Sequence, residues 1–113
     1  MKPTAVLICP GRGSYASKEL GFLARTLRDG PVREALTHAD SQRQAASEPA
    51  ISELDGAARF RPGTHQKGTN AAELIYLSTM AHSELLFEKY DIVAVLGNSL
   101  GWYTALAAGG ALA

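Results

Sequence analysis

The segment DIVAVLGNSLGWYTALAAGGALA, Asp91–Ala113, decides the fold of this 113-residue chain. Its first part is a continuous apolar run that ends at Gly97, which predicts a buried strand. Its last part, from Trp102 onward, is rich in alanine and predicts a helix. Gly97, Ser99 and Gly101 therefore stand at a strand-to-helix turn, where a sharp change of direction lifts the serine hydroxyl clear of the sheet.

Composition and charge restrict the classes of protein to which the chain can belong. Apolar residues make up 46% of it, as in a globular protein, and its length suits one domain, 1–113. Eleven basic residues balance eleven acidic ones, so the sequence predicts neither a nucleic-acid partner nor a membrane partner. The longest apolar runs are too short for a signal peptide or a membrane span, and we expect a cytoplasmic protein.

The single cysteine, Cys9, excludes an internal disulfide and a multi-cysteine zinc site. It ends the apolar run AVLIC, so a small buried hydrophobe is favoured over a reactive thiol.

Hydrophobic periodicity and turn residues predict the other elements. The apolar, β-branched run over Thr4–Cys9 predicts a first buried strand. Helices are predicted from Ser17 as N-cap, from Pro31, around Ile51–Leu54 and over Asn70–Lys89, with an exposed polar stretch at 41–49 and a loop at 59–69. Asn70 with Glu73 resembles a capping box, which makes Asn70 the N-cap of the long helix.

This order of elements predicts an α/β fold. Two all-apolar strands joined through helices imply a parallel sheet with helices on both faces. Two strands are few for such a sheet, so we expect the chain to be the first, incomplete part of a larger α/β unit.

The turn at Ser99 has the sequence context of a nucleophile elbow. The helix that follows aims its N-terminal N–H groups at the reacting centre, and the N–H of Leu100 can hold a developing oxyanion. The alternative is a glycine-rich strand-to-helix turn in which the serine is incidental.

The residues from Gly97 to Leu112, GNSLGWYTALAAGGAL, resemble the signature of malonyl-CoA:acyl-carrier-protein transacylases and of the acyltransferase domains of polyketide and fatty-acid synthases. PGRGSY at 10–15 matches a second signature of that family, and TNAAEL at 69–74 weakly matches a third. The resemblance implies an α/β-hydrolase-like acyltransferase domain, of which this chain is the N-terminal segment without the downstream half.

By that resemblance, Ser99 is the nucleophile that takes a malonyl or related acyl group from coenzyme A and passes it to an acyl carrier protein. The coenzyme A thioester is then a substrate, and no bound cofactor or metal is implied. The backbone N–H groups of Leu100 and Arg12 form the oxyanion hole. The Arg12 side chain either attracts coenzyme A phosphates or a malonyl carboxylate, or is a solvated loop charge.

The sequence departs from the family at two positions beside the nucleophile. Asn98 replaces a histidine and Trp102 a glutamate, which makes both candidate substrate-binding residues at the pocket entrance. The family's general base and malonyl-binding arginine lie downstream of the elbow, so a complementary chain, a truncation or a disrupted gene would each account for the sequence.

The three histidines of the chain are weak substitutes for the missing base. His38 and His65 lie in polar stretches and are predicted to be solvated, and His82 is predicted to be a surface or structural residue of the long helix. Two other functions stay open: a serine esterase-like hydrolase, which shares the elbow, and a catalytically inactive fragment or carrier-docking module.

Overall fold

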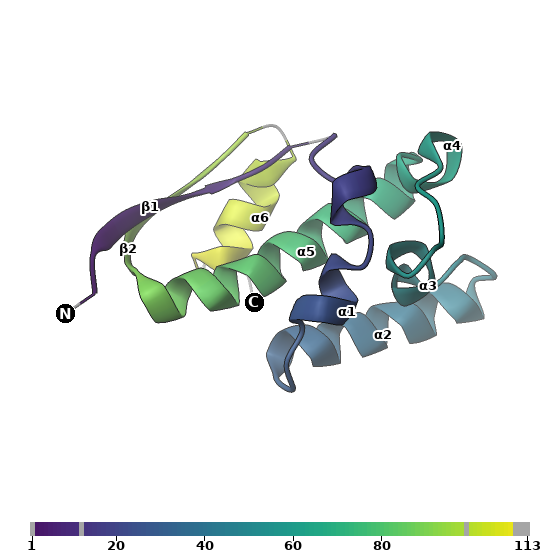
Figure 1. Ribbon diagram of the computed structural model, residues 1–113, viewed down its shortest axis with the longest axis horizontal. Coiled ribbons are helices and arrows are strands. Elements are labelled where there is room, and N and C mark those ends of the chain that lie inside the picture. The colour runs from purple at the N-terminus through teal and green to yellow at the C-terminus, as the bar shows by residue number, and fades with distance from the viewer. Residues whose placement is uncertain (1, 12, 99, 110–113) are drawn as a thin grey trace.

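The computed structural model describes residues 2–11, 13–98 and 100–109 of the chain, arranged as strand, helices, strand and helix (Figure 1). The elements are β1 (Thr4–Cys9), a 3-10 turn η1 (Ser17–Glu19), α1 (Phe22–Thr26), α2 (Pro31–Ala45), α3 (Ile51–Asp55), α4 (Pro62–His65), α5 (Gly68–Lys89), β2 (Asp91–Gly97) and α6 (Gly101–Ala108). Both predicted strands, the helix from Pro31 and the short helix at Ile51 are confirmed.

The two strands form a parallel sheet, as the sequence predicts. Thr4 pairs with Asp91 at the start and Cys9 with Gly97 at the end, with a register shift between Ala5 and Val6. The carboxyl ends of β1 and β2 therefore meet at one edge of the sheet. In α/β folds this is the edge where ligands bind.

One face of the sheet is covered by α6 and the end of α5 (Figure 1). Leu7, Cys9 and Ala105 form its buried core, and Leu86 and Val95 pack against them.

The opposite face of the sheet is open. Its side chains Val6, Ile8, Val93 and Leu96 are 50%, 66%, 64% and 48% exposed. The expectation of helices on both faces is therefore wrong for the described residues. Alternate residues of a strand point to opposite faces, and the described helices pack against only one of them.

A larger core lies on the far side of α5 from the sheet, where α1, α2 and α3 pack against this helix (Figure 1). Its buried members are Tyr15, Leu23, Leu27, Val32, Ile51, Leu54, Ala71, Leu74, Ile75, Leu77 and Ala81. Because α5 contributes to this core and touches the sheet, it holds the helical part and the strand part together.

The helix predicted from Ser17 is broken in two. Gly21 adopts a left-handed φ of 79°, which separates η1 from α1. The carboxylate of Asp55 accepts hydrogen bonds from the N–H groups of Leu23 and Ala24, both at 3.3 Å. This buried acceptor at the first turn of α1 sets where the helix begins, so Ser17 is not its N-cap.

Asn70 is not the N-cap of the long helix, because α5 begins two residues earlier, after Lys67. Asn70 is buried, accepts a hydrogen bond from the guanidinium of Arg43 and donates one to the carbonyl of Thr64 at 3.0 Å. The side chain joins α5 to its surroundings rather than capping it.

The stretch predicted to be exposed at 41–49 is partly helical and contains a buried arginine. Arg43 is 3% exposed and donates to the carbonyl of Pro49 at 2.6 Å and to the carboxylate of Glu73 at 2.7 Å. A guanidinium is tolerated inside a protein when its donors are satisfied in this way.

Candidate active site

The turn after β2 is hydrogen-bonded to the end of β1. The N–H of Asn98 donates to the carbonyl of Cys9 at 3.1 Å, and the N–H of Gly101 donates to the carbonyl of Asn98 at 2.9 Å. Asn98 is therefore held against the end of β1, and Gly101, the first residue of α6, is held to Asn98.

Gly101 occupies a position that has no space for a side chain. A Cβ built there would lie 2.8 Å from the carbonyl carbon of Cys9 and 2.9 Å from the carbonyl oxygen of Pro10. These neighbours are backbone atoms, which cannot rotate away. The second glycine of the serine turn is thus needed for α6 to start directly on the carboxyl end of β1.

The structure brings together the two segments that the sequence analysis links, but not every residue proposed for the site is described. Ser99 and Arg12 lie outside the described residues. Leu100 is the N-cap of α6 and is half-buried against the larger core. Asn98 is exposed, and Trp102 belongs to the first turn of α6, with its side chain not described.

The loop after β1 is anchored at its far end by Tyr15. The Tyr15 hydroxyl donates to the Asp55 carboxylate at 2.6 Å, and both residues are buried. Burial, and then this hydrogen bond, raise the pKa of Tyr15 far above its ordinary value, so the group stays a donor. Among the described residues around this loop, Cys9 lies in the sheet and Tyr15 in the helical core.

Cys9 is fully buried, in agreement with its interpretation as a small hydrophobe. Burial raises the pKa of its thiol, which lowers the fraction of the reactive thiolate.

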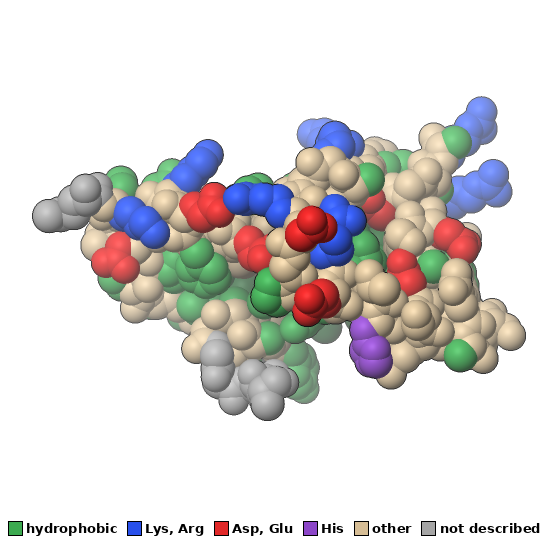
Figure 2. All heavy atoms as spheres, turned by 90° about the horizontal axis from the view of Figure 1, so that it is seen from below, with side chains coloured by type: hydrophobic (Ala, Val, Ile, Leu, Met, Phe, Trp, Pro, Cys, Tyr) green, Lys and Arg blue, Asp and Glu red, His purple; other side chains and the backbone are tan. Residues whose placement is uncertain are grey.

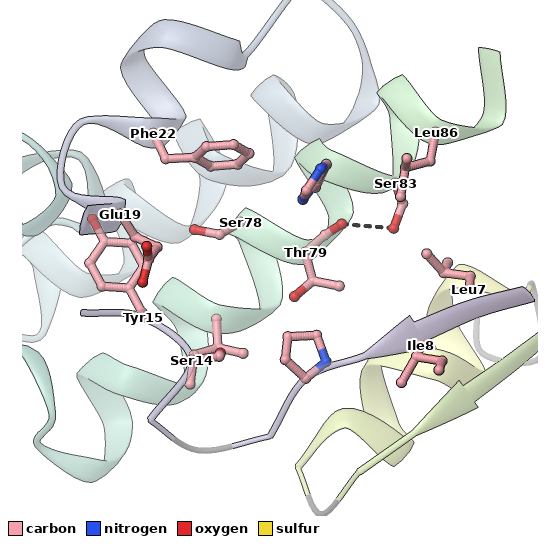
Figure 3. A pocket seen from close by; sticks show the side chains of 13 residues that line it. Leu7, Ile8, Ser14, Tyr15, Glu19, Phe22, Ser78, Thr79, Ser83 and Leu86 are labelled. Atoms are coloured by element: carbon pink, nitrogen blue, oxygen red, sulfur yellow. Dashed lines mark hydrogen bonds between the residues drawn. The ribbon is translucent and has the colours of Figure 1, made fainter. Parts of the chain in front are cut away.

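A cavity of about 410 Å³ lies beside this loop, between β1, α1 and the middle of α5 (Figure 3). It is lined by Leu7, Ile8, Pro10, Ser14, Tyr15, Glu19, Phe22, Ile75, Ser78, Thr79, His82, Ser83 and Leu86. This cavity is not predicted from the sequence. The available signal was that small hydroxyl residues interrupt the apolar stripe of the long helix at 78, 79 and 83.

Two serines on the cavity wall differ in their hydrogen bonding. The hydroxyl of Ser83 donates to the carbonyl of Thr79 at 2.7 Å, inside the helix (Figure 3). The hydroxyl oxygen of Ser78 is buried and has no hydrogen-bond partner among the described residues. Buried polar groups are seldom left in this state.

His38 and His82 are exposed, as the sequence predicts for His38 and allows for His82. The prediction for His65 is wrong, because its side chain is only 2% exposed. Its Nδ1 accepts from the N–H of Arg61 at 3.0 Å and its Nε2 donates to the carbonyl of Leu54 at 2.7 Å. Both ring nitrogens are thus occupied by backbone groups of neighbouring segments, and the ring serves the fold.

Acidic and basic side chains are interleaved on the face of the molecule drawn in Figure 2, so neither charge dominates there. Within the described residues, histidine, cysteine and carboxylate side chains form no group of three that would hold a metal ion. None of the described helices combines the length and apolar character needed to cross a bilayer.

No protein-family model, curated protein or solved structure matches the chain.

Proposed function

We propose that this protein is an acyltransferase that takes a malonyl or related acyl group from coenzyme A as an ester on Ser99 and passes it to an acyl carrier protein. The Ser99 hydroxyl attacks the thioester carbonyl, an O–C bond replaces the C–S bond, and the hydroxyl proton ends on the released coenzyme A thiol. In the second half, the carrier's thiol forms a new C–S bond, the ester bond breaks, and the thiol proton returns to Ser99.

One observation carries the proposal: α6 begins on the carboxyl end of β1, with Gly101 against the backbone of Cys9 and Pro10. A serine at the preceding turn is useful as a nucleophile when that turn is rigid and faces a helix N-terminus. The hydrogen bond from the N–H of Asn98 to the carbonyl of Cys9 holds the residue before Ser99 against β1. The N–H of Leu100, at the start of α6, is proposed as one backbone oxyanion donor, and the second donor proposed from the sequence, the N–H of Arg12, lies outside the described residues.

The proton that leaves Ser99 needs a base for fast reaction, because a serine hydroxyl is a weak nucleophile at neutral pH. Among the described histidines, His65 is unsuitable because its ring nitrogens are both occupied. The proposal takes the base from a histidine of a complementary chain, so the isolated chain is expected to be acylated slowly. The carrier protein and the acyl-CoA are the other partners.

The experiment is intact-mass spectrometry of the chain after incubation with malonyl-CoA and acetyl-CoA. We expect an added acyl mass that is absent from Ser99→Ala and retained in Ser41→Ala, a matched change at an exposed serine of α2. Adding a carrier protein should move the mass to the carrier. Release of the free acid without a carrier would instead indicate a hydrolase, and the absence of an adduct with every acyl-CoA would contradict catalysis by this chain alone.

A further inference from the structure

The cavity between β1, α1 and the middle of α5 has a polar end and an apolar end (Figure 3). Ser14, Glu19 and Ser78 lie toward one end in this view. Leu7 and Leu86 lie toward the other end, where the wall is hydrocarbon. A cavity divided in this way suits an amphipathic ligand, whose polar head and apolar tail contact different parts of the wall.

Two hydroxyl groups on the wall are already engaged by the protein itself. The Tyr15 hydroxyl donates to the Asp55 carboxylate at 2.6 Å, and the Ser83 hydroxyl donates to the carbonyl of Thr79 at 2.7 Å. The protons of these two hydroxyl groups are therefore not available to a ligand.

Four other polar side chains on the wall form no hydrogen bond within the part of the chain that the structure describes: Ser14, Ser78, Thr79 and His82. The Oγ atom of Ser78 is buried, and Thr79 is only 9% exposed. His82 is exposed, so its ring lies at the mouth of the cavity, tilted against that of Phe22 at 5.7 Å. Buried hydroxyl groups are seldom left without a partner, so this part of the wall points to a ligand.

Glu19 gives the polar end its charge. Its Oε1 accepts a hydrogen bond from the N–H of Ala16 at 3.0 Å, and its carboxylate forms no ion pair with the described residues. A carboxylate only accepts, so a ligand must bring a donor to this end. The described lining residues include no lysine or arginine, so the polar end favours a positive head group and repels a carboxylate.

An ammonium group matches this end in hydrogen-bonding capacity as well as in charge. Its N–H donors find acceptors in the Glu19 carboxylate and in the hydroxyl oxygens of Ser14 and Ser78. Thr79 and His82 remain for a second polar group beside the ammonium. A hydroxyl group suits both of them, because it donates and accepts.

We propose that this cavity binds an amphipathic amino alcohol. Its ammonium pairs with Glu19, its hydroxyl bonds to Thr79 and His82, and its aliphatic tail lies along the apolar side chains of β1 and α5. The wall runs along α5 from Ile75 to Leu86, about 16 Å at the rise of an α-helix, which is room for a head group and a tail of about six carbons.

Binding in this cavity is independent of the acyl transfer proposed for Ser99. None of the described residues of the serine turn, at 97, 98, 100 and 101, lines the cavity. A ligand held there is therefore bound by the loop after β1, by α1 and by α5, and its binding is measurable whether or not the chain is acylated.

The first test compares three ligands that share one tail and differ in the head group. 2-Amino-1-octanol carries the ammonium, octane-1,2-diol has a hydroxyl in its place, and 2-hydroxyoctanoate brings a carboxylate. Isothermal titration calorimetry of the full chain at neutral pH should give the amino alcohol a Kd at least about tenfold lower than that of the diol, and no binding of the carboxylate. Equal affinities for the amino alcohol and the diol, or tighter binding of the carboxylate, would overturn the proposal.

The second test changes the wall. Glu19→Gln keeps a hydrogen-bonding oxygen but removes the charge, and should weaken binding of the amino alcohol about tenfold, to the affinity of the diol. Glu53→Gln, at an exposed position of α3, should leave the affinity unchanged. Ser78→Ala should weaken binding roughly fivefold, whereas Ser83→Ala, whose hydroxyl is engaged inside α5, should change it less than about twofold.

Amide ¹⁵N shifts recorded during the same titration locate the site. We expect saturable shifts at Ser14, Glu19, Ser78 and Thr79, strongly reduced in Glu19→Gln. Binding of the amino alcohol that is unaffected by both Glu19→Gln and Ser78→Ala would place it elsewhere on the protein and overturn the cavity as its site.

Discussion

Gly101, the first residue of α6, lies against the backbone carbonyl groups of Cys9 and Pro10, so the helix after the serine turn starts in direct contact with the end of β1. This contact depends on the missing side chain. It joins residues from the two ends of the described chain, and it places the turn and the loop after β1 at one sheet edge.

Replacing Gly101 by alanine should damage the fold as well as the turn. A Cβ at this position meets backbone atoms at 2.8 and 2.9 Å, so β1 and α6 must separate. We expect the free energy of unfolding to fall by about 3 kcal/mol, measured by urea denaturation. Gly63→Ala is the control, because nothing lies within 4 Å of a Cβ there and the change should be neutral or slightly stabilising. Equal effects of the two substitutions would show that α6 does not approach β1 so closely.

Tyr15→Phe should destabilise the protein by leaving the buried carboxylate of Asp55 without its shortest hydrogen bond. A loss of about 2 kcal/mol is expected for such a group. Tyr103→Phe, at a tyrosine that is 70% exposed, should have no measurable effect.

The same pair gives a pH dependence. Because the folded protein raises the pKa of Tyr15 above 10, its contribution to stability is complete below pH 10, where the unfolded chain also keeps the proton. Above that pH the unfolded chain ionises first, and stability should fall by about 1.4 kcal/mol for each pH unit. Denaturation curves recorded from pH 9 to 11 should show a shallower decline for Tyr15→Phe than for the original chain, and parallel curves would contradict the assignment.

Arg43→Met should be among the most damaging single changes in the helical part. The substitution leaves the carbonyl of Pro49, the side chain of Asn70 and the carboxylate of Glu73 without their common donor. A decrease of about 3 kcal/mol in the free energy of unfolding is expected when one side of such a network is removed. Arg28→Met removes an exposed ion pair with Glu88 and should lower the free energy of unfolding much less. The measurement to compare is therefore the ratio of the two decreases.

The two faces of the sheet should respond differently to truncation. Leu7 is 6% exposed and Ile8 is 66% exposed, although they are neighbours in β1. Leu7→Ala should lower the free energy of unfolding by about 3 kcal/mol, and Ile8→Ala by less than about 1 kcal/mol. If thermal denaturation shows that Leu7→Ala and Ile8→Ala lower the stability equally, another molecule or segment covers the sheet face that contains Ile8 in solution.

Much of the fold was readable from local patterns. The continuous apolar runs of β1 and β2 and the long periodic stripe of α5 each specify an element without reference to the rest of the chain. Parallel pairing followed from the helices between the strands. The strand-to-helix turn was also predicted from the sequence, because Gly97 and Gly101 on either side of it have few uses other than a tight turn or a close approach.

What the sequence alone determined, then, was where the strands and long helices lie and that a glycine-flanked serine stands between a strand and a helix. The tertiary structure decided the features that depend on partners distant in sequence. The Asp55 carboxylate sets the start of α1, and the hydrogen bond from Arg43 engages the Asn70 side chain that would otherwise cap α5. The hydrogen bond to the carbonyl of Leu54 makes His65 a buried structural group. The cavity beside the loop after β1 belongs to the same class, since its walls come from β1, α1 and α5, which meet only when the chain is folded.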